Sequence, residues 1–356
     1  MFLAWSEIRR NKLRFLLITS ILLLVSFLVF FLSGLATGLA NLNREAVDKW
    51  DAQAVVLTEE SDKSLYQSSL DRGEADALDA KETAIVGQMG SIANNGDVKK
   101  NVVLFGIDPD EFIMPKVSEG EAALSTENGV IAADVLKDEG FAIGDTLELS
   151  STDTKLEIIG FTDQARFNAA PVLYMNLDDL QQLKFGEAAE MNADLVNAII
   201  IKDDNWSKLK APDDLEIIEM ETFIENLPGY TEQNMTLTYM IYFLFVISAA
   251  IVAIFLYVLT VQKISMFGLM KAQGISSGYL AKSVVAQTFI LATIGVVVGF
   301  GLTWLAGSFL PSAVPVQFDL MTMIIYGLIL IVVAIAGAVI SVWTIIRIDP
   351  LEAIGG

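Results

Sequence analysis

Methionine and tyrosine side chains recur at helical spacing at the start of a charge-free stretch. Met235, Tyr239 and Tyr242 stand at positions i, i+4 and i+7, so one helix face would carry a thioether and two phenols, with Met240 beside them. Such a face at a membrane surface suits a flat, amphipathic ligand. Tyrosine is also common at membrane interfaces where no ligand binds. The spacing alone leaves both interpretations open.

Several kinds of chemistry are excluded by composition. The chain has no cysteine and no histidine, which removes disulfides, thiolate metal sites and the most common metal ligand and general base. It also has no G-x-x-x-x-G-K-[ST] run and no zinc-binding pair. We therefore expect a chain that is not an enzyme, has no intrinsic cofactor and has no metal site of its own.

The elements that would position these residues are membrane helices. Four stretches lack Asp, Glu, Lys and Arg, and each is longer than the roughly 20 apolar residues that cross a bilayer. They are residues 15–43, 236–262, 283–317 and 320–346. The first resembles a secretory signal, because four basic residues precede it and small residues follow. Its apolar run exceeds the usual signal core, which favours a retained helix.

Basic residues near the helix ends set the orientation. They precede the first helix, occur in the 263–282 segment as Lys263, Lys271 and Lys282, and follow the last helix as Arg347. Both chain ends and the 263–282 segment should be cytoplasmic. Because 40 of the 44 acidic residues and 15 of the 23 basic ones fall between the first two helices, the large segment there should be an acidic domain outside the cytoplasm.

The fold class expected is membrane α-helical with one extracytoplasmic α+β domain. Short β-rich runs such as 54–57, 83–86 and 146–149 predict strands, while 129–139 and 177–183 predict helices, the second capped by Asn176. The predicted order is: amphipathic cytoplasmic helix 1–14, transmembrane helix 15–40, outer domain 41–235, transmembrane helix 236–262, cytoplasmic segment 263–282, transmembrane helix 283–310, outer turn 311–319, transmembrane helix 320–346 and cytoplasmic tail 347–356.

The cytoplasmic segment predicts a short helix that ends at Gly274. Met266, Phe267, Leu269 and Met270 should lie on its exposed surface. An apolar helix without a core of its own suits a partner groove, although a connector held against the bilayer has the same pattern. Small residues four apart, which let helices approach closely, occur at Gly34 and Gly38 and at Gly295 and Gly299.

Two blocks of sequence resemble the permeases of MacB- and FtsX-type ABC transporters. One is YVLTVQKISMFGLMKAQGISSGYL, which carries Gln262, Lys263, Gly268, Lys271, Ala272 and Gly274, and the other is the tail RIDPLEAIGG, with Pro350, Glu352 and Ala353. The outer segments NGVIAADVLKDEGFAIGDTLEL and KLEIIGFTD are also similar to that family. Within that family, the amino-acid sequences of these segments are most similar to those of the Hrt-type haem exporter permeases of Gram-positive bacteria.

The resemblance implies a multi-pass cell-membrane homodimer with a separate ABC ATPase bound at the cytoplasmic face. ATP would bind to that partner, and no nucleic-acid partner is expected. The coupling residues would be Lys263, Phe267, Gly268, Met270, Lys271 and Gly274. Haem would be the exported substrate, with Met235, Tyr239, Met240, Tyr242 and Phe31 as its predicted binding residues. Met and Tyr can both ligate haem iron.

Other functions remain open at this stage. The cargo could be a lipoprotein, an antimicrobial peptide or a lipid. The chain could instead be a signal relay that controls an outer partner, or a receptor or adhesin with no ATPase.

Overall fold

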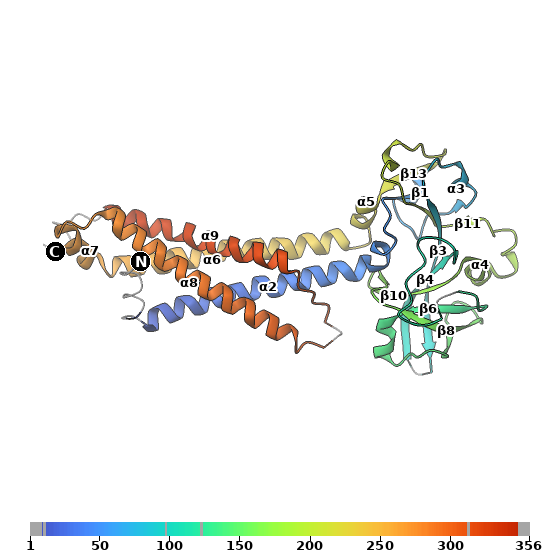
Figure 1. Cartoon of the computed structure of the whole chain (residues 1–356), viewed down its shortest axis with the longest axis horizontal. Coiled ribbons are helices and arrows are strands. Elements are labelled where there is room, and N and C mark those ends of the chain that lie inside the picture. Colours follow the sequence, from blue (N-terminus) through green and yellow to red (C-terminus); the bar gives the residue numbers. More distant parts are fainter. Residues whose placement is uncertain (1–8, 10–11, 97, 122–123, 312–313, 348–356) are drawn as a thin grey trace. The chain divides into compact units, whose positions relative to one another are not determined.

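The chain forms two compact units in a computed structural model that describes residues 9, 12–96, 98–121, 124–311 and 314–347 (Figure 1). One unit is helical and comprises Met1–Leu39 and Asn234–Gly356, and the other is Ala40–Gln233. Most of the predicted 1–14 helix and nearly all of the tail lie outside the described residues.

Four long helices build the helical unit. They are α2 (Lys12–Asp48), α6 (Tyr230–Val261), α8 (Ser277–Gly307) and α9 (Leu320–Arg347), joined by the short α7 (Ile264–Ala272) between α6 and α8. All four are long and apolar enough to cross a membrane, α9 over Leu320–Val339. The expectation of four transmembrane helices is confirmed. Helices α2 and α6 also continue beyond the predicted spans into the Ala40–Gln233 unit.

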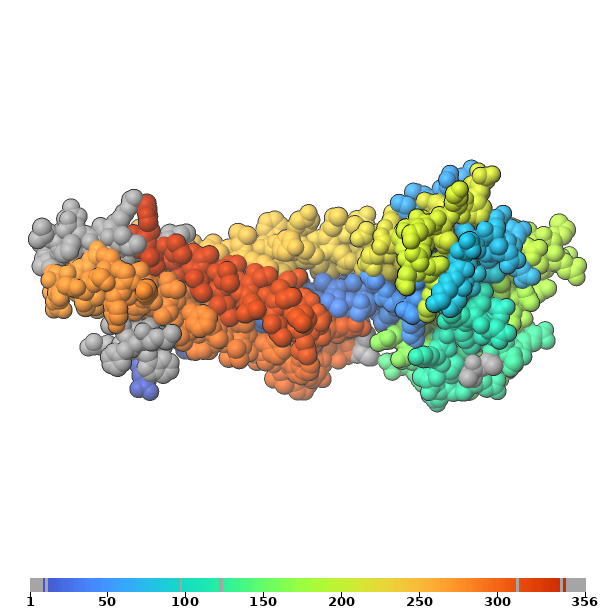
Figure 2. All heavy atoms as spheres, turned by 45° about the horizontal axis from the view of Figure 1, so that its top comes forward, coloured from blue at the N-terminus to red at the C-terminus, as the bar shows by residue number. Residues whose placement is uncertain are grey.

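The helical unit is held together by apolar packing, and several of its buried hydroxyls, those of Ser26, Thr288 and Thr303, donate to carbonyls of their own helices. Val29 and Phe30 of α2 lie in one buried cluster with Ile241 and Phe245 of α6. Ser26 donates to the carbonyl of Leu22 at 2.6 Å, as serine does when it is buried in an apolar helix. Figure 2 shows α9 lying along α8.

The outer unit is built on a mixed β-sheet. Its strands run in the order β13-β1-β12-β3-β4-β10-β6-β8-β5, while β7 pairs with β3 and β8, and β9 pairs with β10. The bounds are β1 (Ala54–Thr58), β3 (Thr83–Asn95), β4 (Val98–Ile107), β5 (Glu119–Gly120), β6 (Gly129–Ala133), β7 (Thr146–Leu149), β8 (Lys155–Thr162), β9 (Arg166–Phe167), β10 (Ala170–Asn176), β12 (Ala198–Ile201) and β13 (Leu215–Glu219). Strands β2 (Leu70–Asp71) and β11 (Leu195–Val196) form a separate pair.

Two pairings are parallel, and the rest are antiparallel. Strand β10 runs parallel to β4, with Val172 opposite Val103, and β6 runs parallel to β8. The long antiparallel pair β3–β4 extends from Gly87 opposite Gly106 to Asn95 opposite Val98. Helices α3 (Glu74–Ala77), α4 (Leu177–Phe185) and α5 (Met220–Glu225) and four short 3-10 segments complete the α+β domain that the sequence predicted.

The predicted helix over 129–139 is wrong. Gly129–Ala133 is strand β6, which lies between β10 and β8 with all five residues buried, and only Asp134–Glu139 turns as a 3-10 helix. A continuous apolar run has the same appearance in a buried strand as in a buried helix, because neither shows alternation. By contrast, α4 begins as predicted, with the Asn176 side chain accepting a hydrogen bond from the amide of Asp178 at 2.9 Å.

Candidate functional site

The predicted ligand residues of α6 lie on its exposed surface in the helical unit. Met235 is 55%, Tyr239 58% and Tyr242 52% exposed, and Met240 is exposed beside them. The rings of Tyr239 and Tyr242 meet edge to face, with their centroids 6.4 Å apart. The opposite face of α6 is buried, with Ile241 packed against α2. The thioether and the two phenols therefore lie on the exposed face of α6.

Phe31, the fifth predicted ligand residue, comes from a different helix. It lies on α2, half-buried, and stacks on Phe27 with ring centroids 5.9 Å apart. The preceding residue, Phe30, is fully buried against neighbours from α6 and α9. Phe31 thus lies on the helix that packs against α6.

Helix α7 lies at the same end of the helical unit as the start of α2 and the end of α9 (Figure 1). The expectation that Phe267 is exposed is wrong, because it is only 3% exposed and packs against Leu280 and Val284 of α8. Met266 and Leu269 are exposed, as expected. One side of α7 is therefore anchored by an aromatic ring to the helical unit, and its other side presents apolar groups outward.

The end of α7 is built from standard capping geometry. Gly274 has φ +90°, a conformation that favours glycine, and its amide donates to the carbonyl of Lys271 at 2.9 Å. The amide of Ile275 donates to Met270 at 3.0 Å, which completes a Schellman-type cap. Ser276 then caps α8 by accepting from the amide of Tyr279. Gly274 therefore ends α7, as the sequence predicted.

The start of α7 is tied to the start of α2. Arg14 donates to the side chain of Gln262 at 2.8 Å, and the Lys263 ammonium lies 5.9 Å from the centre of the Phe15 ring. Lys263 is also the N-cap residue of α7. Motion of α7 would therefore reach α2 and α6 as well as α8.

The glycine pair on α8 lies against α2. A methyl group added at Gly295 would meet the Leu22 side chain at 2.9 Å, and one at Gly299 would meet Ser26 at 2.8 Å. Such contacts leave no room for a side chain, so α8 and α2 cross at backbone distance. Gly34 and Gly38 on α2 lie instead against Phe318 and the carbonyl of Pro315, in and near the 311–319 turn.

The outer unit contains a clamp of charged and phenolic groups that sequence reasoning missed. Arg44 forms two hydrogen bonds to Asp48, two to Glu221 at 2.9 Å each, and one to the Tyr230 hydroxyl at 3.2 Å. These groups come from the end of α2, from α5 and from the start of α6. Only the pair Arg44 and Asp48, four residues apart on one helix, could have been anticipated from the sequence.

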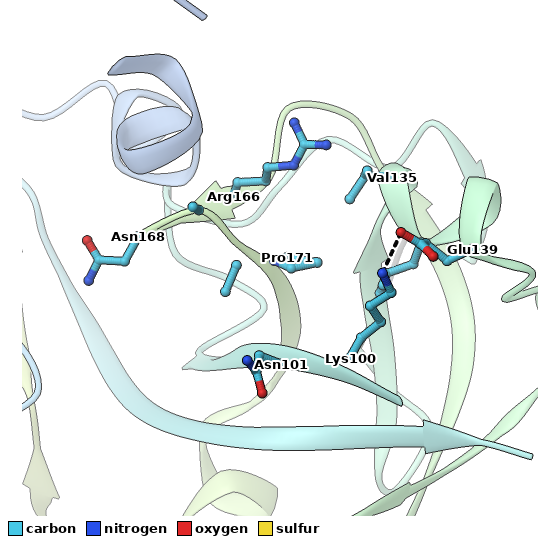
Figure 3. A pocket seen from close by; sticks show the side chains of 10 residues that line it. Lys100, Asn101, Val135, Glu139, Arg166, Asn168 and Pro171 are labelled. Carbon is cyan, nitrogen blue, oxygen red and sulfur yellow. Dashed lines mark hydrogen bonds and ion pairs between the residues drawn. The ribbon is translucent and has the colours of Figure 1, made fainter. Parts of the chain in front are cut away.

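A polar hollow of about 430 Å³ opens elsewhere in the outer unit (Figure 3). Lys100 and Glu139 form a salt bridge of 2.6 Å on one side, and Arg166 and Asn168 lie on the other. The Lys100 charge is already balanced by Glu139. Across the described part of the chain, no group of three or more His, Cys, Asp or Glu side chains could hold a metal ion.

One carboxylate of the outer unit is partly buried. Glu111 accepts a hydrogen bond from the amide of Ile85 at 2.9 Å, while its other carboxylate oxygen is buried with no partner among the described residues. Burial, with a smaller contribution from the negative charge of Asp108, raises the pKa of Glu111 to about 7.

Comparison with known proteins places these features in one family. The chain matches the MacB-like periplasmic core domain over residues 15–216, more than half of its length, and the FtsX-like permease C-terminal domain over residues 238–350. These matches cover the first helix with the outer unit and the remaining three helices with α7.

Similar curated proteins span the whole chain. A Staphylococcus haemolyticus protein named for hemin transport, the permease HrtB, is 25% identical over 356 residues, which cover 100% of this chain and 99% of the relative. The Staphylococcus epidermidis protein of the same name is 28% identical over 360 residues, with the same coverage. An uncharacterized ABC transporter permease of Mycobacterium tuberculosis is 22% identical over 365 residues, again covering 100% and 99%.

Among solved structures, the extracellular domain of the ABC-type transporter YknZ from Gram-positive bacteria matches with a TM-score of 0.32 and 13% identity, covering 43% of this chain and 83% of that one. The two family matches establish the family, since together they cover residues 15–216 and 238–350, which include most of the outer domain and most of each membrane helix. The chain therefore belongs to the MacB/FtsX-type family of ABC transporter permeases.

Proposed function

We propose that this chain is the permease subunit of an efflux pump that removes haem from the cell membrane. It acts as a homodimer, and a separate ABC ATPase at the cytoplasmic face supplies the energy. Both termini and α7 lie on the cytoplasmic side, while residues 40–233 lie outside.

The observation that carries this proposal is similarity over the full length to two relatives named for hemin transport. Similarity confined to the membrane helices would support only a permease of this type. Here the first helix, the outer domain and α6, where a ligand of the membrane would bind, are all included in the aligned length.

The surface of α6 supports haem as the cargo. Haem is flat and largely apolar, and it partitions into the membrane, so it can reach a site that opens sideways to lipid. Tyr239, Tyr242 and Met235 offer phenolate and thioether groups, both of which ligate haem iron in proteins, and the chain has no histidine or cysteine. The four charge-free stretches favour such a cargo, because a hydrophilic solute would need polar groups along its route.

The path of force follows from the connections of α7. When the ATPase subunits close, they push on the exposed Met266 and Leu269, and Phe267 transmits the displacement to α8. Helix α6 begins at Tyr230 beside the Arg44 clamp and ends two residues before α7, so it carries the same displacement outward. Haem held against α6 is released as this surface changes shape.

Titration with hemin tests the binding site. The full-length protein in detergent should shift the Soret band of hemin. The affinity for hemin measured from this shift should fall about tenfold in each of the variants Tyr239→Phe and Met235→Ala, which corresponds to a loss of roughly 1.4 kcal/mol in binding free energy. Tyr257→Phe is a matched control, because Tyr257 is an exposed tyrosine of the same helix near its other end. A shift that survives in both site variants would exclude this site.

Transport tests the cargo. Cells that carry the chain with its ATPase should survive hemin at concentrations that kill cells without it, and purified complex should hydrolyse ATP faster when hemin is added. A lipoprotein, peptide or lipid cargo predicts stimulation by those ligands alone. A signal relay predicts no stimulation by any of them and an outer protein partner in cross-linking.

A further inference from the structure

A small cavity lies where α6, α7 and α8 meet. Its volume is about 20 Å³, and its walls include Thr260 of α6, Lys263 of the turn, Phe267 of α7 and Gln287 of α8. A cavity needs roughly 10–15 Å³ to admit one water molecule. This cavity is therefore large enough for one water and too small for most other ligands.

Gln287 is the polar group that requires an explanation. It is only 4% exposed, and its side-chain nitrogen is buried with no hydrogen-bond partner among the described residues. Leaving such a buried donor unpaired destabilises the folded state. The neighbouring hydroxyl of Thr288, by contrast, donates to the carbonyl of Val284 within its own helix at 3.0 Å. Gln287 is thus a buried donor on the wall of a water-sized space.

The other walls supply what a buried water needs. Such waters usually make two to four hydrogen bonds, and besides Gln287 the residues that line the cavity include Thr260 and Lys263, whose side chains carry a hydroxyl and an ammonium group. The backbone amide of Lys263 also donates a hydrogen bond to the backbone carbonyl of Thr260 at 3.0 Å, which holds the turn between α6 and α7 in place. Polar residues of α6, of the turn and of α8 therefore line the same cavity.

We propose that one water molecule binds in this cavity and joins Gln287 of α8 to the turn that leads into α7. Gln287 is then a positioning residue for coupling. A hydrogen bond through water can lengthen or re-form at little cost, so the turn before α7 can adjust against α8 while Phe267 stays packed against Leu280 and Val284 and moves with them. The role in coupling rests on the proposed function of α7 as the contact with an ATPase, whereas the water site does not.

Hydroxyl-radical footprinting of the full-length protein tests the water directly, because radicals formed from a bound water oxidise the side chains around it. Phe267 should be oxidised despite its burial, and oxidation should fall at least several-fold in Gln287→Met, which fills the space with an apolar group. Phe245 is the control, since it is also buried in the helical unit but does not line this cavity. If Phe267 is not oxidised in the unaltered protein, the proposed water site is wrong.

Coupling is measured as the stimulation of ATP hydrolysis by hemin in the assembled complex. Gln287→Met and Thr260→Val should each reduce the stimulation several-fold, whereas Thr288→Val should retain it. Full stimulation in both cavity variants overturns the positioning role. If the unaltered complex shows no stimulation at all while Phe267 is still oxidised, the proposed function fails and the water site stands.

Discussion

The guanidinium of Arg44 and the carboxylate of Glu221 face each other through two parallel hydrogen bonds of 2.9 Å, although 177 positions separate them in the chain. This paired geometry is the strongest that arginine forms with a carboxylate. Arg44 lies in the last part of α2, four residues before the helix ends at Asp48, and Glu221 lies on α5, which precedes α6 in the chain. The contact therefore fixes the spacing between the outer ends of these two helices.

Arg44→Met should lower the stability of the outer unit by about 1–2 kcal/mol, because Glu221 and Tyr230 lose a charged partner while solvent still reaches Glu221. Thermal unfolding of the full-length protein in detergent measures the change. Lys155→Met is the control, since it removes an exposed salt bridge to Glu148 that should contribute almost nothing. Equal unfolding temperatures for the two variants would contradict a structural role for the clamp.

Gly299→Val should loosen the contact between α8 and α2 at a cost of about 1–3 kcal/mol, because the new side chain would overlap Ser26 and the Leu23 carbonyl. Gly301→Val provides the comparison, since nothing lies within 4 Å of the position that its first side-chain carbon would occupy. The measurement is thermal unfolding in the same detergent. The expected order of stability is unaltered protein, then Gly301→Val close behind, and Gly299→Val well below both.

Leu269→Asp should weaken binding of the ATPase subunit by at least tenfold, because a charge would replace an exposed apolar group of α7. Copurification of the two subunits from membranes measures the loss. Ser308→Asp places the same charge at the other end of α8, also on an exposed residue, and should leave copurification unchanged. If the ATPase binds the Leu269→Asp variant normally, α7 only connects α6 to α8 and is not the binding surface for the ATPase.

Glu111→Gln should stabilise the outer unit more at pH 8 than at pH 5. Burial raises the pKa of Glu111 from 4.5 to about 7, so the folded state holds this proton more tightly than the unfolded chain does. The contribution of the protonated Glu111 carboxyl to the stability of the folded state is greatest below pH 4.5 and is lost as the pH rises through about 7. Glutamine has the shape of the neutral acid and can still accept from Ile85.

The difference between the two pH values should be on the order of 1 kcal/mol, discounted for partial solvent exposure. Thermal unfolding at both pH values measures it. Glu60→Gln, at an exposed position, should give the same shift in unfolding temperature at each pH. If Glu111→Gln changes the unfolding temperature equally at both pH values, ionisation of the Glu111 carboxyl does not destabilise the folded state.

The parts of the fold that the sequence predicted are those with a strong, local signal. Charge-free runs longer than a bilayer identify the four membrane helices, and Asn176 and Gly274 mark helix ends through capping chemistry that involves only neighbouring residues. Strand β7 was predicted with its observed bounds, because its residues alternate between buried and exposed.

The failures are features that depend on contacts between distant residues. Gly129–Ala133 is a strand because β10 and β8 flank it, and nothing in the five residues themselves excludes a helix. Phe267 is buried because Leu280 and Val284 of the next helix cover it. The partner of Arg44 on α5 is equally distant in sequence, so the clamp could not be found without the structure.

The contact between Arg44 and Tyr230, 3.2 Å from guanidinium to hydroxyl, also means that the two ends of the outer domain meet. A folded lobe whose ends adjoin can be spliced into a chain without stretching the segments on either side. Residues 40–233 are thus suited to transplantation as a cassette. Chimaeras that exchange this lobe between related permeases would replace the outer domain while leaving the four membrane helices unchanged.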